Sequence, residues 1–205
     1  KQIILSIKEY YIKVNNDDIL LEKIAKTLFE IGCLNSFWSK LYAKFFQDMI
    51  KEFPDVKNIC IINFNNFLSL FENIEFIDIN DNNYNLFFDN NKKNEKRRAK
   101  SSFFINLTNY KVIDEIYIYN LIFKLLNDID YNKDNKDMLQ VNEEIIENIF
   151  IMITNGKELL KESLKKWEKI TTDITLLSKM KMIDYNGISR KLSFKCMDLL
   201  EELEE

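Results

Sequence analysis

The residue types that most often carry catalysis are absent or scattered in this sequence. None of the 205 residues is His, so neither a Ser-His-Asp nor a Cys-His nucleophile pair can be built, because both need an imidazole base. A His-liganded zinc site and an imidazole switch near neutral pH are excluded for the same reason. Cys33, Cys60 and Cys196 are far apart and odd in number, which indicates buried free thiols rather than a disulfide framework or a metal knuckle.

Loops that hold phosphate or calcium are also missing. Three Gly residues in the whole chain cannot supply a P-loop or a dinucleotide fingerprint, which cluster glycines so that backbone can approach phosphate. Asp78, Asp81 and Asp89 lack the spacing and the Gly of a calcium loop, so we interpret them as solvated. We therefore predict a protein that is not an enzyme, with no catalytic residue, metal, cofactor or small-molecule substrate. An enzyme that uses carboxylates or a Lys nucleophile is the alternative, although no convergent acid–base group can be located.

One basic segment could contact phosphate or an acidic protein surface. Its densest part supplies our candidate RNA-binding residues, because cations neutralise the phosphate backbone: Lys96, Arg97, Arg98 and Lys100. No aromatic residue is interleaved for base stacking, and a solvated flexible loop is the alternative. The net charge of −4 argues against a broadly basic surface but allows a local one.

Three aromatic residues could anchor a protein partner. Phe37 and Trp38 stand at the expected start of a helix and would form an anchor pair if exposed. Burial in the core is the alternative, because Leu41 and Tyr42 follow at helical spacing. Trp167 lies among lysines, where either a partner-facing indole or the packing of an amphipathic helix fits the pattern.

The segments that must position these residues have helical periodicity. Apolar side chains recur every three or four residues over about 3–14, 19–31, 37–49, 56–77, 95–110, 116–126, 141–154, 159–182 and 189–203. Asp17 or Asp18 is the expected N-cap of the second helix. Gly32, Gly156 and Gly187 all fall at expected helix ends, where we predict left-handed C-caps.

These helices, nine or ten with mostly short connections, predict antiparallel hairpins of about 40 residues. We predict an all-α chain, a HEAT-type α-α superhelix of about five antiparallel hairpins over residues 1–205, with an irregular helical bundle as the alternative. Two polar stretches, near 78–95 and 128–138, are predicted as mobile loops. No apolar run reaches the ~18 residues that a membrane span needs.

The order of the segments resembles the middle domain of eukaryotic initiation factor 4G, a five-hairpin HEAT domain shared by several RNA-metabolism scaffolds. The resemblance covers nearly the whole chain, in four stretches: 19–46 with a Ser-x-Leu-Tyr-Ala pattern, 95–113 with a basic lead-in to a Phe-containing helix, 155–160 with a Gly-containing break, and 188–201 with a closing helix. Two departures stand out. Ser193 replaces the second Arg of the closing motif, and Ser101-Ser102 replace the family's Gly-Asn.

This resemblance implies a noncatalytic, cytoplasmic scaffold domain of translation initiation. It would bind and stimulate a DEAD-box RNA helicase of the initiation factor 4A type, with mRNA as an additional expected contact and no membrane partner. The hairpins around Trp38 and Arg190 are the two expected contact zones. The candidate partner-binding residues are Phe37, Trp38, Lys40, Trp167, Arg190 and Lys191. A related helicase- or adaptor-binding module in splicing, ribosome biogenesis or histone-mRNA translation is the alternative.

Overall fold

The computed structural model describes residues 2–77 and 84–204, and these residues form helices and no β-strand. The helices are α1 (Gln2–Lys13), α2 (Asp18–Leu34), α3 (Ser39–Glu52), α4 (Val56–Leu68), η1 (Ser69–Phe71), α5 (Tyr84–Asn109), α6 (Glu115–Tyr131), η2 (Lys136–Met138), α7 (Leu139–Lys161), α8 (Leu164–Lys179) and α9 (Arg190–Glu204). The all-α prediction is therefore confirmed. None of the described helices has both the length and the apolar character needed to cross a membrane.

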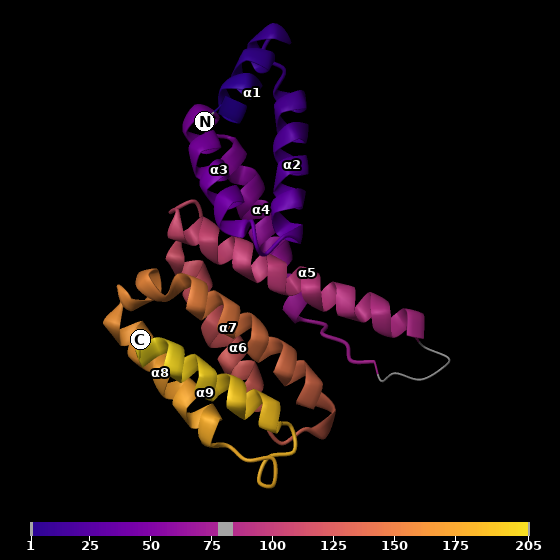
Figure 1. Cartoon of the computed structure of the whole chain (residues 1–205), viewed down its shortest axis with the longest axis vertical. Coiled ribbons are helices and arrows are strands. Elements are labelled where there is room, and N and C mark those ends of the chain that lie inside the picture. The colour runs from indigo at the N-terminus through magenta and orange to yellow at the C-terminus, as the bar shows by residue number, and fades with distance from the viewer. Residues whose placement is uncertain (1, 78–83, 205) are drawn as a thin grey trace.

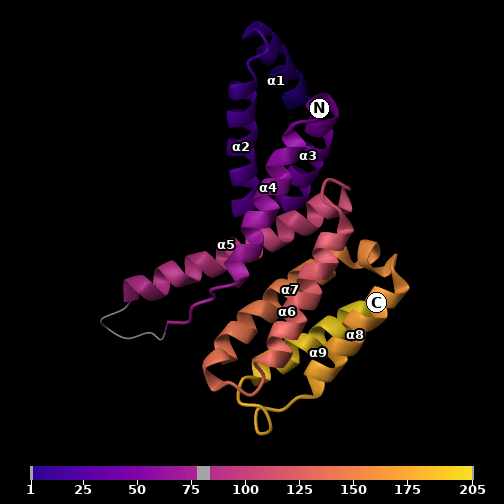
Figure 2. The ribbon, with the colours of Figure 1, turned by 180° about the vertical axis from the view of Figure 1, so that it is seen from behind.

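Helix α5 crosses the middle of the molecule and separates two groups of helices. Helices α1–α4 lie on one side and α6–α9 on the other, and successive helices within each group run in opposite directions (Figures 1 and 2). Helix α5 packs against α3 and α2 in the first group and most closely against α7 in the second. The apolar core consequently runs through α5 from one group to the other.

The inner part of α5 has no solvent-exposed face. Residues 101–108 are all buried, with Phe103 and Phe104 facing a cluster of aromatic rings that includes Phe29 and Phe67. Phe67 stacks on Phe104 with ring centroids 4.9 Å apart. A helix that is buried on all sides lies at the centre of a core, which is the position that α5 occupies between the two groups.

Side-chain caps and left-handed residues define the helix ends. The Asp17 carboxylate accepts hydrogen bonds from the backbone N–H groups of Ile19 and Leu20, at 3.0 and 3.1 Å, so Asp17 is the predicted N-cap of α2. Among the described residues, positive φ angles occur at Asn15, Asn16 and Lys111 and at no glycine. The prediction of left-handed glycine caps is therefore wrong.

The glycines instead permit close approaches between segments. Gly156 lies inside α7, so the predicted helix end there is wrong. Gly32 lies inside α2, which ends at Leu34, close to the predicted end. A Cβ on Gly156 would lie 2.4 Å from Ile105 Cδ1, so the missing side chain lets α7 approach α5. Gly187 lies in the α8–α9 connection, where a Cβ would lie 2.3 Å from the carbonyl oxygen of Asn132.

Both predicted mobile loops are largely helical. In the first, residues 84–95 belong to α5, while residues 78–83 lie outside the described residues. In the second, α6 continues to Tyr131 and η2 begins at Lys136, which leaves a short connection at 132–135. The prediction failed at α5 because the apolar residues of its first half are confined to 84–88, and the polar run 89–96 that follows has no apolar stripe to reveal a helix. The expected break at 155–156 is likewise absent, since α7 continues to Lys161, and α8 is unbroken at Thr171.

Candidate protein-binding surfaces

The turn between α2 and α3 carries a cluster of exposed apolar side chains, which we term the aromatic surface. It consists of Leu34, Phe37, Trp38 and Leu41. Phe37 is 80% exposed and Trp38 is 49% exposed, so both belong to the surface and not to the core. The two rings meet edge to face, with centroids 4.7 Å apart. Aromatic side chains in this state are the residue type that most often anchors a protein partner.

Hydrogen bonds to α5 hold the base of the aromatic surface in place. Ser39 follows Trp38 directly and is buried. Its Oγ lies 2.8 Å from Ser102 Oγ and accepts a hydrogen bond of 3.1 Å from Asn106 Nδ2. The backbone N–H of Trp38 donates to Asn35 Oδ1 at 3.2 Å. These contacts fix the start of α3, so the rings project from a positioned backbone, which lowers the ordering cost of binding.

Three lysines lie close to the aromatic surface. Lys40 is exposed on α3, one turn from Phe37. Burial raises the pKa of the thiol of Cys33, the neighbour of Leu34, to about 12. The positive charges of Lys100 and Lys96 on α5 oppose that rise, which indicates that both lysines lie near Cys33. Lys100 is half-buried, and burial lowers its pKa. Of the four candidate RNA-binding residues, Lys96 is the exposed one.

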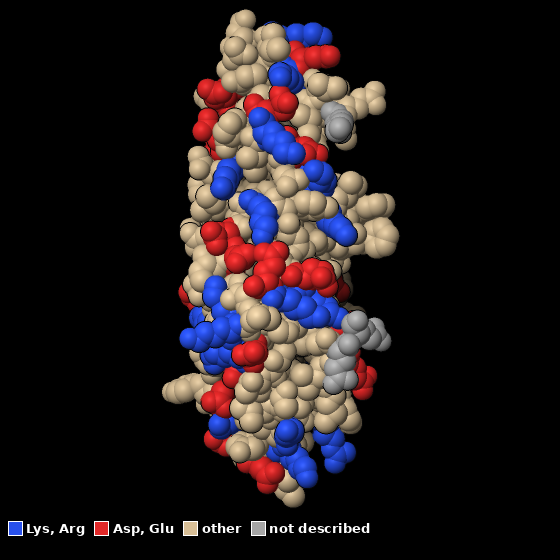
Figure 3. Space-filling model, turned by 90° about the vertical axis from the view of Figure 1, so that its left-hand side faces the viewer, with Lys and Arg blue, Asp and Glu red and all other residues tan. Residues whose placement is uncertain are grey.

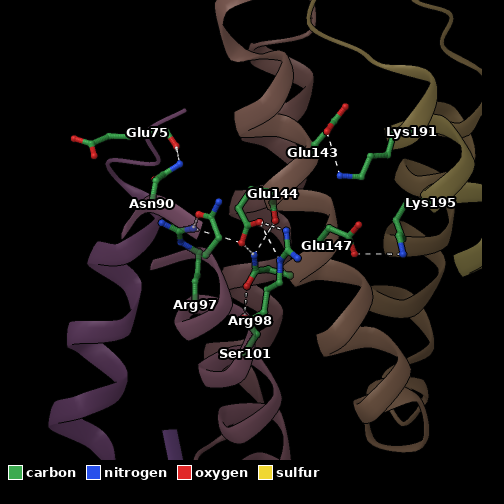
Figure 4. A network of polar contacts seen from close by, with 12 residues as sticks. Glu75, Asn90, Arg97, Arg98, Ser101, Glu143, Glu144, Glu147, Lys191 and Lys195 are labelled. Atoms are coloured by element: carbon green, nitrogen blue, oxygen red, sulfur yellow. Dashed lines mark hydrogen bonds and ion pairs between the residues drawn. The ribbon is translucent and has the colours of Figure 1, made fainter. Parts of the chain in front are cut away.

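The two arginines of the basic segment point into the molecule (Figure 4). Arg97 is 5% exposed; its Nε donates to the carbonyl oxygen of Leu70 at 3.0 Å and its Nη1 pairs with Glu144 at 3.4 Å. Arg98 donates from Nε to the other Glu144 oxygen at 3.0 Å and also contacts it through Nη2. The candidate RNA-binding residues Arg97 and Arg98 are therefore engaged in internal contacts, because both pair with the same carboxylate, Glu144 of α7.

The pKa values of the two arginines are shifted in opposite directions because their environments differ. Burial lowers the pKa of Arg97, and the attraction of Glu144 offsets only part of the effect. Burial also opposes the charge of Arg98, but hydrogen bonds and charge from Glu144, with Glu147 and Glu95 adding to them, raise its pKa overall. Glu144 also accepts a hydrogen bond of 2.8 Å from Asn148 Nδ2. The network is thus a structural connection between α5 and α7.

Helix α7 uses two further acidic residues to hold α9. Glu143 pairs with Lys191 at 3.2 Å, and Glu147 pairs with Lys195 at 3.3 Å (Figure 4). The candidate Lys191 is thus exposed but engaged with α7. Trp167, another candidate, is half-buried and packs against the core, with Lys161 Nζ 5.7 Å from its ring centroid. The packing alternative therefore describes Trp167 better than a partner-facing indole.

A second apolar surface lies between the end of α8 and the start of α9, and we term it the C-terminal groove. It has a volume of about 1050 Å³ and is lined by Ser178, Lys179, Met180, Lys181, Met182, Ile183, Arg190, Ser193, Phe194 and Met197. Ile183 is 88% exposed and Phe194 is 61% exposed. Ser193 Oγ donates to the carbonyl oxygen of Met180 at 3.0 Å, which fixes the floor of the groove to α9.

Sequence reasoning found Arg190 but missed the apolar part of this groove. Phe194 and Met197 lie on α9 away from its buried stripe, which consists of Leu192, Cys196 and Leu199. A large apolar residue outside the buried stripe of an amphipathic helix is a usable signal for an interaction surface. The groove thereby joins Arg190 to a contiguous apolar surface.

The described ranges hold neither an accessible ionised thiol nor a metal-ligating group beside these surfaces. The thiols of Cys33, Cys60 and Cys196 are buried, and burial raises the pKa of each to about 12. Within residues 2–77 and 84–204, no three His, Cys, Asp or Glu side chains are grouped to hold a metal ion. On the face shown in Figure 3, Lys and Arg lie among Asp and Glu over most of the surface.

Comparison of the chain with known protein families, with curated proteins and with solved structures found no significant match. The likeness to the middle domain of initiation factor 4G therefore remains a prediction from the sequence. The structure supplies an all-helical chain and two exposed apolar surfaces, one on each side of α5.

Proposed function

We propose that this chain is a noncatalytic scaffold domain that binds and stimulates a DEAD-box RNA helicase of the initiation factor 4A type. One observation carries the proposal: two exposed apolar surfaces lie on helices far apart in the chain, the aromatic surface at α2–α3 and the C-terminal groove at α8–α9. The same two regions, around Trp38 and Arg190, are the contact zones that the family resemblance implies.

The alternating helices also support the finer part of the proposal, a HEAT-type superhelix. In such a fold, successive antiparallel pairs bury their apolar stripes against neighbouring pairs and leave an extended surface for a partner. Helices α6 and α7, and helices α8 and α9, support this part of the proposal, because the members of each pair pack closely and run in opposite directions. The crossing of α5 is the departure from a regular stack.

Two separate contacts would allow the scaffold to act on a partner with two lobes. Once one lobe is bound, the second contact becomes intramolecular, with an effective concentration on the order of mM for a short connection. A scaffold that favours the closed arrangement of the lobes by about 1.4 kcal/mol shifts their equilibrium tenfold. ATP hydrolysis remains in the helicase, and the proposed contact with mRNA involves Lys96 and Lys100.

The proposal is tested by titrating the chain into an initiation factor 4A-type helicase and measuring both affinity and RNA-dependent ATPase rate. We expect the double variant Phe37→Ala/Trp38→Ala to bind at least about tenfold more weakly, because both rings would lie in the interface. Tyr131→Ala is the matched control, since Tyr131 is 89% exposed on α6 outside both surfaces. A chain that neither binds the helicase nor changes its ATPase rate would refute the proposed function.

A further inference from the structure

The rim of the C-terminal groove carries positive charge that no carboxylate of the described residues pairs with. Lys179, Lys181 and Arg190 all line the groove. Among the described residues, none of the three has a carboxylate within ion-pairing distance, whereas Lys191 and Lys195 on the same helix do. The N-terminus of α9 lies beside Arg190 and adds partial positive charge. This end of the groove therefore favours an anionic group on whatever binds there.

The floor of the groove is apolar and adaptable. Met180, Met182, Met197 and Phe194 supply most of it. Unbranched, polarisable Met side chains repack around differently shaped apolar partners. From Arg190 to Met197 the groove follows about two turns of α9, or roughly 10 Å at 1.5 Å per residue. An amphipathic helix fits such a site by placing apolar residues at i, i+3 or i+4, and i+7 along it.

The charge reverses toward the other end of the groove. Asp198 and Glu201 are exposed on α9, one turn beyond Phe194 and Met197 respectively. The surface thus changes along α9 from positive, through apolar, to negative. A helix with acidic residues at one end and basic residues at the other complements this sequence of charges.

We propose that the C-terminal groove binds an amphipathic helix of a partner protein, with the acidic end of that helix next to Lys179, Lys181 and Arg190. The inference rests on the proposed function in that the groove is one of its two contact zones, but it does not depend on the partner being a helicase. The observations favour a helix over RNA, because the floor is apolar and Phe194 is its one aromatic ring.

A pair of designed peptides tests the charge preference. Both are 16-residue helices with the same leucine stripe; the first has Glu in its opening two turns and Lys in its last turn, and the second has Lys at all of those positions. We expect the acidic peptide to bind the whole chain at least about tenfold more tightly in fluorescence anisotropy, with an affinity that falls as salt rises. Equal binding of the two peptides, or binding of neither, would overturn the proposal.

Matched variants locate the site. Lys179→Glu/Arg190→Glu should weaken the acidic peptide about tenfold and strengthen the basic one, and Phe194→Ala should weaken both about tenfold. The controls Lys165→Glu and Leu164→Ala make the same kinds of change at exposed positions near the start of α8 and should leave binding unchanged. Equal effects in variants and controls would refute this location.

Two other occupants give distinct results, each of which overturns the proposal. A 12-nucleotide poly(U) RNA that displaces the acidic peptide with similar affinity would identify nucleic acid as the ligand. A concentration-dependent dimer in sedimentation, lost in Phe194→Ala, would identify a second copy of this chain. If the peptide binds as expected but the helicase does not, the groove assignment stands and the proposed function fails. If the helicase binds but the peptide does not, the groove assignment alone is refuted.

Discussion

Glu144 shows how one side chain can determine the role of two others. It is 4% exposed and is paired with both Arg97 and Arg98. Two positive charges face one negative charge in a region largely removed from water, so the carboxylate is needed to keep Arg97 in place. This pairing also explains why a basic run in the sequence is a poor guide to a basic surface.

Removal of the Glu144 charge should be far more costly than removal of a neighbouring surface charge. We expect Glu144→Gln to lower the free energy of unfolding by about 3 kcal/mol, because Arg97 would remain buried without its counterion. Glu143→Gln, which breaks the exposed pair with Lys191, should cost less than about 1 kcal/mol. Urea unfolding of both variants measures the difference, and equal midpoints would contradict the structural role of the network.

The buried thiols should weaken the fold at alkaline pH. Burial raises the pKa of Cys196 to about 12, whereas an unfolded thiol ionises near 8.5. The unfolded state therefore loses its proton first as pH rises, and stability falls between about pH 9 and 12 by about 1.4 kcal/mol per pH unit for each such thiol.

The variant Cys196→Ala should remove one thiol's share of this pH dependence. We expect its unfolding free energy, measured in urea from pH 8 to 11, to fall less steeply than that of the parent chain. Only the slopes are compared, because the lost sulfur also leaves a cavity that lowers stability at every pH. Parallel pH curves for the two proteins would contradict a raised pKa of Cys196 in the folded state.

At the scale of helices, the sequence predicted the elements that have one apolar face. The helices near 3–14, 116–126 and 189–203 were found because their buried residues recur every three or four positions, and α2 and α3 were found in the same way. The Asp17 cap was also predictable, because its signal is local. The exposure of the Phe37–Trp38 pair could not be predicted, because an apolar residue at helical spacing is compatible with either a core or a surface position.

The errors in the sequence prediction share one physical cause, which is that tertiary context determines the result. Glycine was expected to end helices, yet Gly156 lies inside α7, where another helix approaches it. The polar run 89–96 of α5 continues directly into the buried segment 101–108, so the chain is helical at 89–96 although neither propensity nor pattern indicates it. Arg97 was expected on a surface, because its own segment contains no sign of the pairing with Glu144. That partner is 47 residues away in the sequence and reaches Arg97 only in the folded chain.

Packing of α5 against α7 should depend on the missing Cβ of Gly156. We expect Gly156→Ala to destabilise the chain by about 1–3 kcal/mol through overpacking against Ile105, despite the better helix propensity of Ala. Ile105→Val removes the Cδ1 atom that the new methyl group would meet and should restore part of the loss in the double variant. Asn155→Ala, at the exposed neighbouring position, should change stability by less than about 0.5 kcal/mol. Additive effects of the two substitutions at 105 and 156 would contradict this contact.

At the scale of the whole molecule, α5 joins the cores of two groups of helices. Residues 101–108 pack toward both α3 and α7, so neither group has a closed core without this segment. Helix α1 is the opposite case, because Ile4 is its one fully buried residue among those described. Local stability should therefore be highest in residues 101–108 of α5 and lowest in α1.

Native-state hydrogen exchange measures this gradient. We expect the amides of 101–108 to exchange only through global unfolding, and the other helices that border α5 to lose their slowest protection at the same denaturant concentration. Amides of α1 should exchange through small local openings, at least about tenfold faster than those of α5. Two separate global transitions, one for each group of helices, would contradict a core that is continuous through α5.

The burial of residues 101–108 of α5 on every side also restricts how this sequence can change over generations. In α9, a solvent-facing position separates most buried ones, so single substitutions can accumulate on the outer face without disturbing the packing. Residues 101–108 have no such outer face. A change of volume there needs a compensating change on a neighbouring helix, as the close approach of Ile105 and Gly156 illustrates. We expect this segment to drift in coupled pairs, while the exposed faces of the other helices drift one residue at a time.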